Sequence, residues 1–264
     1  MYFTKMQGLG NDFICLDCTE TRPEDLPELA RKLTDRHFGV GGDGLICLCP
    51  SEAADFAMHI FNADGSEGET CGNGLRCIAK LAFDRRLIAR SIMTIETLAG
   101  VKLLSLHLKN GSVETVTVDM GVPELSPEIT VTVKGKHYTV VPVSMGNPHA
   151  VIFADDLEGL DLAALGPCFE HDPAFPDRTN TEFVTVQDPA HLRMRVWERG
   201  SGETLACGSG ACAALAASVA SGRSKRVVTA ELLGGDLDLY WDEQDGHIYM
   251  TGPAVTVFEG EINI

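Results

Sequence analysis

Short runs in which apolar and polar residues alternate are the dominant pattern along the chain. An alternation with a period of two places one face of a strand in the core and the other in water. Strands are predicted on this basis at residues 57–62, 113–118, 129–133, 138–143, 192–198, 226–233, 236–241, 248–251 and 254–262. The chain is therefore expected to be rich in β-structure.

Two stretches depart from this pattern and predict helices. Residues 74–83 have the spacing of an amphipathic helix, and residues 211–220 are mostly alanine, which indicates a helix buried on every side. Each stretch directly follows a glycine-rich turn. The acidic, proline-containing stretch 20–28 is interpreted as a solvated loop or a helix start.

The two predicted helices begin with the same short motif, Cys-Gly-x-Gly. One offset of 136 residues relates Cys71-Gly72-Asn73-Gly74 to Cys207-Gly208-Ser209-Gly210, Gly10-Asn11 to Gly146-Asn147, Glu67 to Glu203, and Gly44 to Asn180. Because a single offset recurs at separate places, we interpret the chain as two copies of one domain, related by a pseudo-twofold axis. The division is predicted near residue 115, which gives domains 1–115 and 116–264.

Composition and charge argue against several classes of protein. The chain has 264 residues, with 38 Asp and Glu against 21 Lys and Arg, and a formal net charge of −17. This acidic balance argues against nucleic-acid binding, which requires a basic surface. We see no signal peptide, and the longest run of small apolar residues, 210–221, is too short to cross a bilayer. We therefore expect no membrane association, and a cytoplasmic protein whose nine cysteines are reduced.

Cys71 and Cys207 differ from the other cysteines because each is predicted to start a helix. Helix N-termini present unpaired N–H groups and a partial positive charge, which lower the pKa of a thiol and bind anions such as carboxylates. The remaining cysteines are interpreted as small apolar packing residues; they are Cys15, Cys18, Cys47, Cys49, Cys77, Cys168 and Cys212. Since Cys15 and Cys18 lack a second ligand pair, no metal site is predicted.

Two equivalent thiols suggest one reaction class in particular. A single activated cysteine would indicate a thiol hydrolase with a histidine partner. If the two halves face each other, the two sulfurs flank one cleft, and bases on opposite faces of a carbon are what stereoinversion requires. No phosphate-cofactor motif is found, and no lysine has the context of a Schiff-base site, so no cofactor is expected.

The motifs resemble those of the diaminopimelate epimerase family, over essentially the whole chain and in family order. The residues that carry this resemblance are Gly8-Leu9-Gly10-Asn11-Asp12-Phe13, Asn62-Ala63-Asp64-Gly65-Ser66, Cys71-Gly72-Asn73-Gly74-Leu75-Arg76-Cys77, Gly146-Asn147-Pro148-His149, Glu198-Arg199-Gly200 and Cys207-Gly208-Ser209-Gly210. The resemblance implies a cofactor-independent isomerase that interconverts LL- and meso-2,6-diaminopimelate in lysine and peptidoglycan biosynthesis.

The resemblance also implies a fold and an assignment of residues. The fold is an α/β (α+β) fold of two pseudosymmetric domains, each a β-barrel-like sheet around a central helix, in a homodimer; the last strand can return to the first domain. Cys71 and Cys207 are the implied catalytic acid/base pair, and His149 and Glu198 the groups that help to set their protonation. The implied substrate-binding residues are Asn11, Asn62, Gly72, Asn73, Asn147, Asn180, Glu198, Arg199, Gly208 and Ser209.

One departure from the family pattern leaves the substrate open. Gly44 stands where many members carry glutamine, so this chain has no side chain there, and Gly44 is not counted as a site residue. A racemase or epimerase for another amino acid is therefore an alternative. A binding or regulatory module without catalysis, with Cys71 and Cys207 as small buried residues, is a second alternative.

Overall fold

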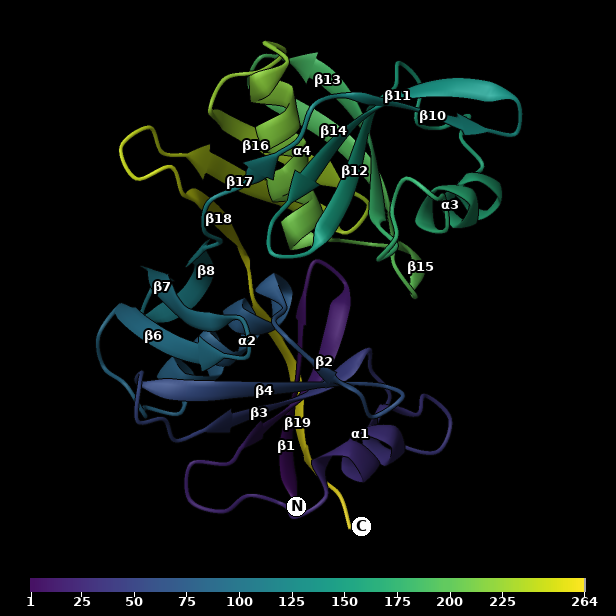
Figure 1. Ribbon diagram of the computed structural model, residues 1–264. Coiled ribbons are helices and arrows are strands. Elements are labelled where there is room, and N and C mark those ends of the chain that lie inside the picture. The colour runs from purple at the N-terminus through teal and green to yellow at the C-terminus, as the bar shows by residue number, and fades with distance from the viewer. Residues whose placement is uncertain (264) are drawn as a thin grey trace. The chain divides into compact units, whose positions relative to one another are not determined.

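The computed structural model describes residues 1–263 and divides them into two compact units (Figure 1). Unit 1 comprises Met1–Asp119 together with the C-terminal segment from Thr251 onward, and unit 2 comprises Met120–Met250. The chain thus leaves unit 1 a few residues after the division predicted at 115/116. Its last strand belongs to unit 1, where the N-terminal amine of Met1 donates to the carbonyl of Ile262 at 2.7 Å.

Unit 1 is built mainly from strands, with two helices. Its elements are β1 (Tyr2–Gly8), β2 (Asn11–Asp17), α1 (Leu26–Thr34), β3 (Gly44–Cys49), β4 (Phe56–Asn62), β5 (Glu67–Gly68), α2 (Gly72–Asp84), β6 (Ile92–Thr97), β7 (Gly100–Lys109), β8 (Ser112–Asp119) and β19 (Val255–Glu261). The strands pair in the order β19, β1, β2, β3, β4, β6, β7, β8, and only the β2–β3 and β4–β6 pairs are parallel.

Unit 2 repeats this order of elements. Its elements are β9 (Glu124–Leu125), β10 (Ile129–Val133), β11 (Lys136–Ser144), β12 (Pro148–Phe153), α3 (Leu162–Glu170), β13 (Asn180–Asp188), β14 (His191–Glu198), β15 (Gly202–Thr204), α4 (Gly208–Ala220), β16 (Val227–Leu232), β17 (Gly235–Trp241) and β18 (Ile248–Pro253), whose last residues lie in unit 1. The strand registers repeat as well: Phe13 pairs with Gly44 in unit 1, and His149 pairs with Asn180 in unit 2. The predicted internal repeat is therefore confirmed.

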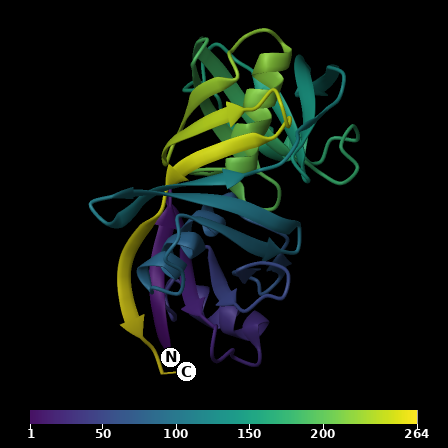
Figure 2. The same ribbon diagram turned by 90° about the vertical axis from the view of Figure 1, so that its left-hand side faces the viewer.

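The sheet of each unit curves around one central helix (Figures 1 and 2). In unit 1, α2 packs against β1, β2, β3, β4, β7 and β8, and in unit 2, α4 packs against β11, β12, β13, β14 and β17. Helix α4 has almost no polar side chains, and every residue of 211–217 is fully buried. A helix without a polar face is stable only where strands cover it on all sides, which explains its position. The structure thus confirms the predicted class of two β-rich α/β units with central helices.

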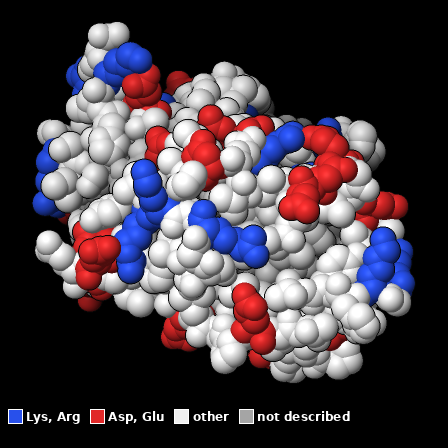
Figure 3. Space-filling view, turned by 90° about the horizontal axis from the view of Figure 1, so that it is seen from above, with Lys and Arg blue, Asp and Glu red and all other residues white. Residues whose placement is uncertain are grey.

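The length of the helices and the distribution of surface charge are two further features of the fold. Within residues 1–263, no helix has both the length and the apolar character needed to cross a membrane. On the face shown in Figure 3, lysine and arginine side chains are interspersed with aspartate and glutamate and form no continuous basic stripe.

Candidate active site

Cys71 caps the N-terminus of α2 in unit 1. Its backbone is extended, and its sulfur accepts a hydrogen bond from the N–H of Gly74 at 3.5 Å. Gly72 and Asn73 are the first residues of the helix, so their N–H groups have no acceptor within it. The Cys-Gly-x-Gly motif therefore places a half-buried thiol beside a set of helix-end amides, as the sequence predicts.

Two asparagines surround Cys71. The Asn11 side-chain oxygen lies 3.7 Å from the sulfur of Cys71 and accepts from the Asn73 amide at 3.1 Å. The Asn73 side-chain oxygen accepts in turn from Arg76, which is fully buried and also donates to the carbonyl of Pro253 at 3.1 Å. Arg76 thus fixes the orientation of Asn73, and through it that of Asn11.

An acidic and basic network holds the other side of Asn11. The Asn11 amide donates to Asp43 at 2.8 Å, and Arg36 donates to both Asp43 and Asp12 at the same distance. Lys5 forms an ion pair with Asp12 at 2.6 Å. Burial acts to raise the pKa of Asp12, but hydrogen bonds and charge from Arg36 and Lys5 outweigh it and hold this pKa below its usual value.

Replacing Asp12 by asparagine should therefore weaken unit 1 in a pH-dependent way. We expect Asp12→Asn to lower the free energy of unfolding by about 1–2 kcal/mol near neutral pH. A carboxyl with a depressed folded-state pKa contributes stability that is fully present above its unfolded-state pKa of about 3.9 and is lost as the pH falls through the folded-state value. Thermal unfolding of both proteins from neutral pH down to about pH 3 checks this; a difference that stays constant with pH would contradict it.

Asn62 is the last residue of β4, apart from the Cys71 cluster of hydrogen bonds. Its amide donates to the hydroxyl of Ser66 at 3.0 Å. Its partner across the sheet is Gly44, where an added Cβ would stand 2.8 Å from the carbonyl oxygen of Phe61. The backbone of this chain therefore has no room for a side chain at position 44 without a shift, which gives the departure at Gly44 a structural basis.

Cys207 occupies the corresponding position in unit 2, at the N-terminus of α4. Its sulfur accepts from the N–H of Gly210 at 3.4 Å and lies 3.6 Å from the hydroxyl of Ser209. Gly208 is the first residue of the helix, and an added Cβ there would stand 2.8 Å from the sulfur of Met250. The same motif thus produces the same local arrangement in both units.

The protonation of Cys207 differs from the sequence-based expectation. Burial, followed by the charges of Glu198 and Glu182, raises the pKa of the Cys207 thiol well above its usual value, and the Ser209 hydroxyl and the Gly210 amide only partly oppose this. The prediction that the helix N-terminus lowers the pKa of this thiol was therefore wrong. The amide dipoles are present, but removing the thiolate from water beside two carboxylates costs more than they supply.

His149 and Glu198 both lie in the neighbourhood of Cys207. Glu198 accepts hydrogen bonds from the Thr204 hydroxyl and from Cys207, and burial raises the pKa of its carboxyl. His149 is fully buried at the start of β12; its Nε2 lies 3.1 Å from the side-chain oxygen of Asn147, and its Nδ1 lies 2.7 Å from Glu182.

Asn180 and Arg199 form the edge of this region. The Asn180 side chain donates to the carbonyl of Pro148 at 2.9 Å and accepts from the backbone N–H of Arg199 at 3.0 Å, so it ties the histidine loop to the turn after β14. The guanidinium of Arg199 donates to the carbonyl of Asp177 and is exposed on its outer side. The predicted site residues of unit 2 thus form one connected region.

Three residues that sequence reasoning did not select support these two regions. Arg76 lies within a quoted motif, but nothing in the pattern revealed that it is fully buried. Glu170 accepts from the Trp197 indole at 2.8 Å and from the N–H of Gly200 at 3.0 Å, and so holds the turn that carries Glu198 and Arg199. Glu182 follows Asn180 and Thr181 at the start of β13, and nothing in this local pattern revealed that its side chain is fully buried.

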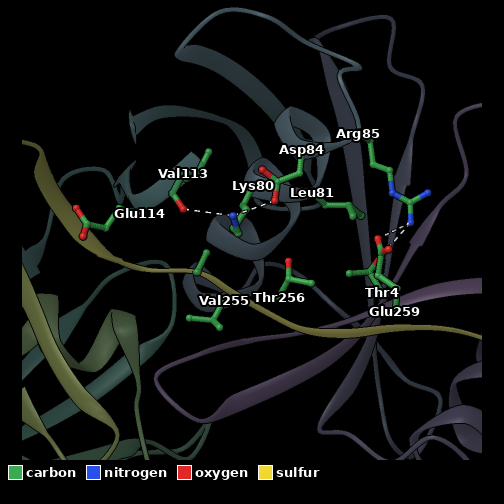
Figure 4. A pocket seen from close by; sticks show the side chains of 11 residues that line it. Thr4, Lys80, Leu81, Asp84, Arg85, Val113, Glu114, Val255, Thr256 and Glu259 are labelled. Atoms are coloured by element: carbon green, nitrogen blue, oxygen red, sulfur yellow. Dashed lines mark hydrogen bonds and ion pairs between the residues drawn. The ribbon is translucent and has the colours of Figure 1, made fainter. Parts of the chain in front are cut away.

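A separate cavity of about 500 Å³ lies in unit 1 between α2, β8 and β19 (Figure 4). None of the predicted site residues lines it. Its charged side chains are already paired: Lys80 with Asp84 at 2.9 Å, Arg85 with Glu259 at 3.3 Å, and Glu114 with Lys109 at 2.7 Å. Because these charges already have partners and neither thiol lines it, this cavity does not compete with the cysteine regions as a candidate active site.

Sequence comparison identifies full-length relatives. The sequence model of a family described as "Diaminopimelate epimerase" matches residues 3–126 and 141–257. A protein of that name from Acetivibrio thermocellus is 52% identical over 277 aligned residues, which cover 100% of this chain and 99% of the relative.

Structure comparison extends the likeness to the fold. A probable proline racemase from Agrobacterium radiobacter K84 superposes with a TM-score of 0.77 at 14% identity, covering 100% of this chain and 93% of the other. A PhzF-family phenazine biosynthesis protein from Bacillus anthracis superposes with a TM-score of 0.76 at 18% identity, covering 100% and 99%. At such low identity these structures show the shared fold alone. The sequence relationship goes further, and by it this chain belongs to the diaminopimelate epimerase family of isomerases.

Proposed function

We propose that this chain interconverts LL- and meso-2,6-diaminopimelate by proton transfer between the substrate α-carbon and two cysteines, without a cofactor, in lysine and peptidoglycan biosynthesis. The observation that carries the proposal is the pair of thiols, Cys71 and Cys207, each capping a helix at the same position of a repeated unit. Family membership supplies the substrate.

In the proposed reaction one thiolate removes the α-proton and the opposite thiol donates a proton to the other face of the same carbon. The C–H electron pair stays on the substrate as a carbanion until the second proton arrives. The two sulfurs have then exchanged their protonation states, and exchange with solvent restores the resting form. In the reverse direction Cys71 and Cys207 exchange roles.

The helix N-termini provide the stabilisation that this carbanion needs. As the α-carbon loses its proton, charge spreads onto the adjacent carboxylate, and N–H groups aimed at that carboxylate lower the barrier. The backbone amides at the starts of α2 and α4 are suited to this role, because the helices themselves hold no acceptor for them. The residues concerned are Gly72, Asn73, Gly208 and Ser209.

The distal amino-acid end of the substrate needs groups of another kind. A zwitterion requires both donors and acceptors, which asparagine side chains offer without a net charge. We assign this role to Asn11, Asn62, Asn147 and Asn180. Arg199 offers a bidentate clamp for a carboxylate, and binding the remote end supplies energy for positioning the reacting carbon.

His149 and Glu198 are proposed to set the protonation of the Cys207 region. Glu198 accepts a hydrogen bond from the thiol, and this contact favours the protonated form of Cys207.

The direct test of the proposed function uses the purified protein with LL-diaminopimelate and no added cofactor. Chiral chromatography should show the meso isomer until equilibrium is reached. Turnover of proline, histidine or glutamate in place of diaminopimelate would assign a different amino-acid racemase, and binding without isomerisation would assign a binding module.

We also propose that the chain acts as a cytoplasmic homodimer. Strand β19 lies at the edge of its sheet and exposes Val255, Val257 and Phe258, next to exposed Tyr2 on β1. An apolar sheet edge of this kind is normally covered by a partner. Analytical ultracentrifugation should give a dimer for the wild type, and Phe258→Asp should shift the protein toward the monomer. A wild-type monomer at micromolar concentration would contradict the proposal.

A further inference from the structure

Glu182 is a fully buried carboxylate and the third residue of strand β13. One of its oxygens, Oε1, lies 2.7 Å from Nδ1 of His149, so the ring proton on that nitrogen points at the carboxylate. Its other oxygen, Oε2, is buried and finds no hydrogen-bond partner among residues 1–263. Leaving a buried carboxylate half satisfied is costly, which makes a purely structural role for Glu182 unattractive.

Glu182 lies next to Cys207, on the inner side of the α4 N-terminus. An added Cβ at Gly210 would stand 2.6 Å from Oε1 of Glu182 and 3.2 Å from the sulfur of Cys207. The carboxylate and the thiol therefore both lie beside Gly210, which has no side chain to separate them. A negative charge at this position opposes the formation of a second one on the sulfur.

The equivalent position of unit 1 has no charge. The offset of 136 residues relates Glu182 to Ile46, Gly210 to Gly74 and Cys207 to Cys71. An added Cβ at Gly74 would meet the side chain of Ile46 at 2.7 Å and the Cβ of Cys71 at 3.5 Å. The same arrangement of a strand residue, a helix glycine and a thiol therefore occurs in both units. The strand residue is an isoleucine in unit 1 and a glutamate in unit 2.

We propose that Glu182 is a positioning residue that anchors His149 and, through the carboxylate charge that it places beside Gly210 and Cys207, keeps the resting proton of the thiol pair on Cys207. This inference rests on the proposed function. The two thiols then begin turnover in different protonation states, with Cys207 protonated as the acid and Cys71 deprotonated as the base. They exchange these roles during turnover.

Two carboxylates, Glu182 and Glu198, face Cys207. Glu198 on β14 also faces the thiol, and its counterpart in unit 1 is the neutral Asn62, so it acts in the same direction. The remaining charged side chains on strands packed against α4 are exposed or ion-paired, and they are Lys136, His137, Asp188, His191, Arg193, Arg195, Asp236 and Asp238.

The test compares Cys207 thiolate formation with and without the Glu182 charge. Thiolate absorbance near 240 nm is followed against pH in the Cys71→Ala variant. The same titration of Cys71→Ala/Cys207→Ala is subtracted as a baseline, which removes the absorbance of all other cysteines. Adding Glu182→Gln, which keeps the size and still accepts from His149, should lower the midpoint by about one pH unit or more. The exposed Glu158 provides the control, because Glu158→Gln should leave the midpoint unchanged.

Activity gives a second readout. In the protein with both cysteines, Glu182→Gln should move the basic limb of the kcat/KM profile to lower pH, whereas a merely structural role would lower activity equally at every pH. If Glu182→Gln does not fold, Glu182→Met removes the charge with an apolar side chain of similar length and should move the midpoint the same way. An unchanged midpoint in the folded variants overturns the inference while wild-type epimerisation stands. A wild type without epimerase activity overturns the proposed function, whatever the midpoint does.

Discussion

Replacing either Cys71 or Cys207 by alanine is expected to lower kcat for epimerisation by about 10³-fold or more. Each thiol serves as the base in one direction and as the acid in the other, so neither direction can proceed without both. Alanine removes the proton-carrying atom and leaves the helix in place, at a cost of about 1 kcal/mol for the lost cap. Circular dichroism should therefore show folded proteins whose turnover in both directions is lost.

Cys168 provides the matched control for these two variants. It is a half-buried thiol on α3 that donates to the carbonyl of Ala164 and belongs to neither thiol region. Cys168→Ala should keep wild-type kcat and KM. Wild-type turnover by a folded Cys71→Ala or Cys207→Ala protein would remove that thiol from the mechanism.

Arg76→Ala is expected to have the largest effect on stability, about 2–4 kcal/mol off the free energy of unfolding. Arg76 is among the largest fully buried side chains, so alanine leaves a cavity that the surrounding strands can only partly fill. It also leaves the carbonyl of Pro253 and the side-chain oxygen of Asn73 without their donor. Because Asn73 then loses its fixed orientation beside Asn11, activity should fall together with stability.

Arg85 at the end of the same helix is the control for Arg76. Its guanidinium is partly exposed and contacts Thr4 and Glu259 at the surface. Exposed ion pairs contribute about 0–1 kcal/mol, so Arg85→Ala should change the unfolding free energy by no more than that. Denaturant titration of both variants measures the difference, and equal losses for Arg76→Ala and Arg85→Ala would show that the burial of Arg76 is not what stabilises unit 1.

Much of the fold follows from local pattern and the repeat. The alternation at 57–62 and 192–198 became β4 and β14, and the stretches after the two Cys-Gly-x-Gly motifs became α2 and α4. Helix α3 was not predicted, because Gly166 and Pro167 both oppose a helix. Tertiary packing outweighs these local preferences in α3, because the Trp197 indole lies where a side chain at position 166 would stand.

The sequence was enough to choose the candidate site residues, but it was not enough to predict the pKa of the Cys207 thiol. The positions of Cys71 and Cys207 at helix starts follow from the motif, since the glycines after each cysteine favour a turn into a helix. The raised pKa of Cys207 does not follow, because it depends on burial and on Glu182, which reaches the thiol from a strand distant in sequence. Long-range neighbours of this kind carry no signal in the local pattern.

Deuterium labelling tests the central claim, proton transfer by two opposed thiols, most directly. The purified protein is incubated with LL-diaminopimelate in D₂O, and the reaction is stopped when only a small fraction has turned over. The product should carry one solvent deuterium at the inverted carbon while the recovered LL-substrate carries none, because the thiol that donates is not the one that accepted the proton. Product that retains its original α-proton, or deuterium appearing equally in recovered substrate, would contradict the two-thiol account.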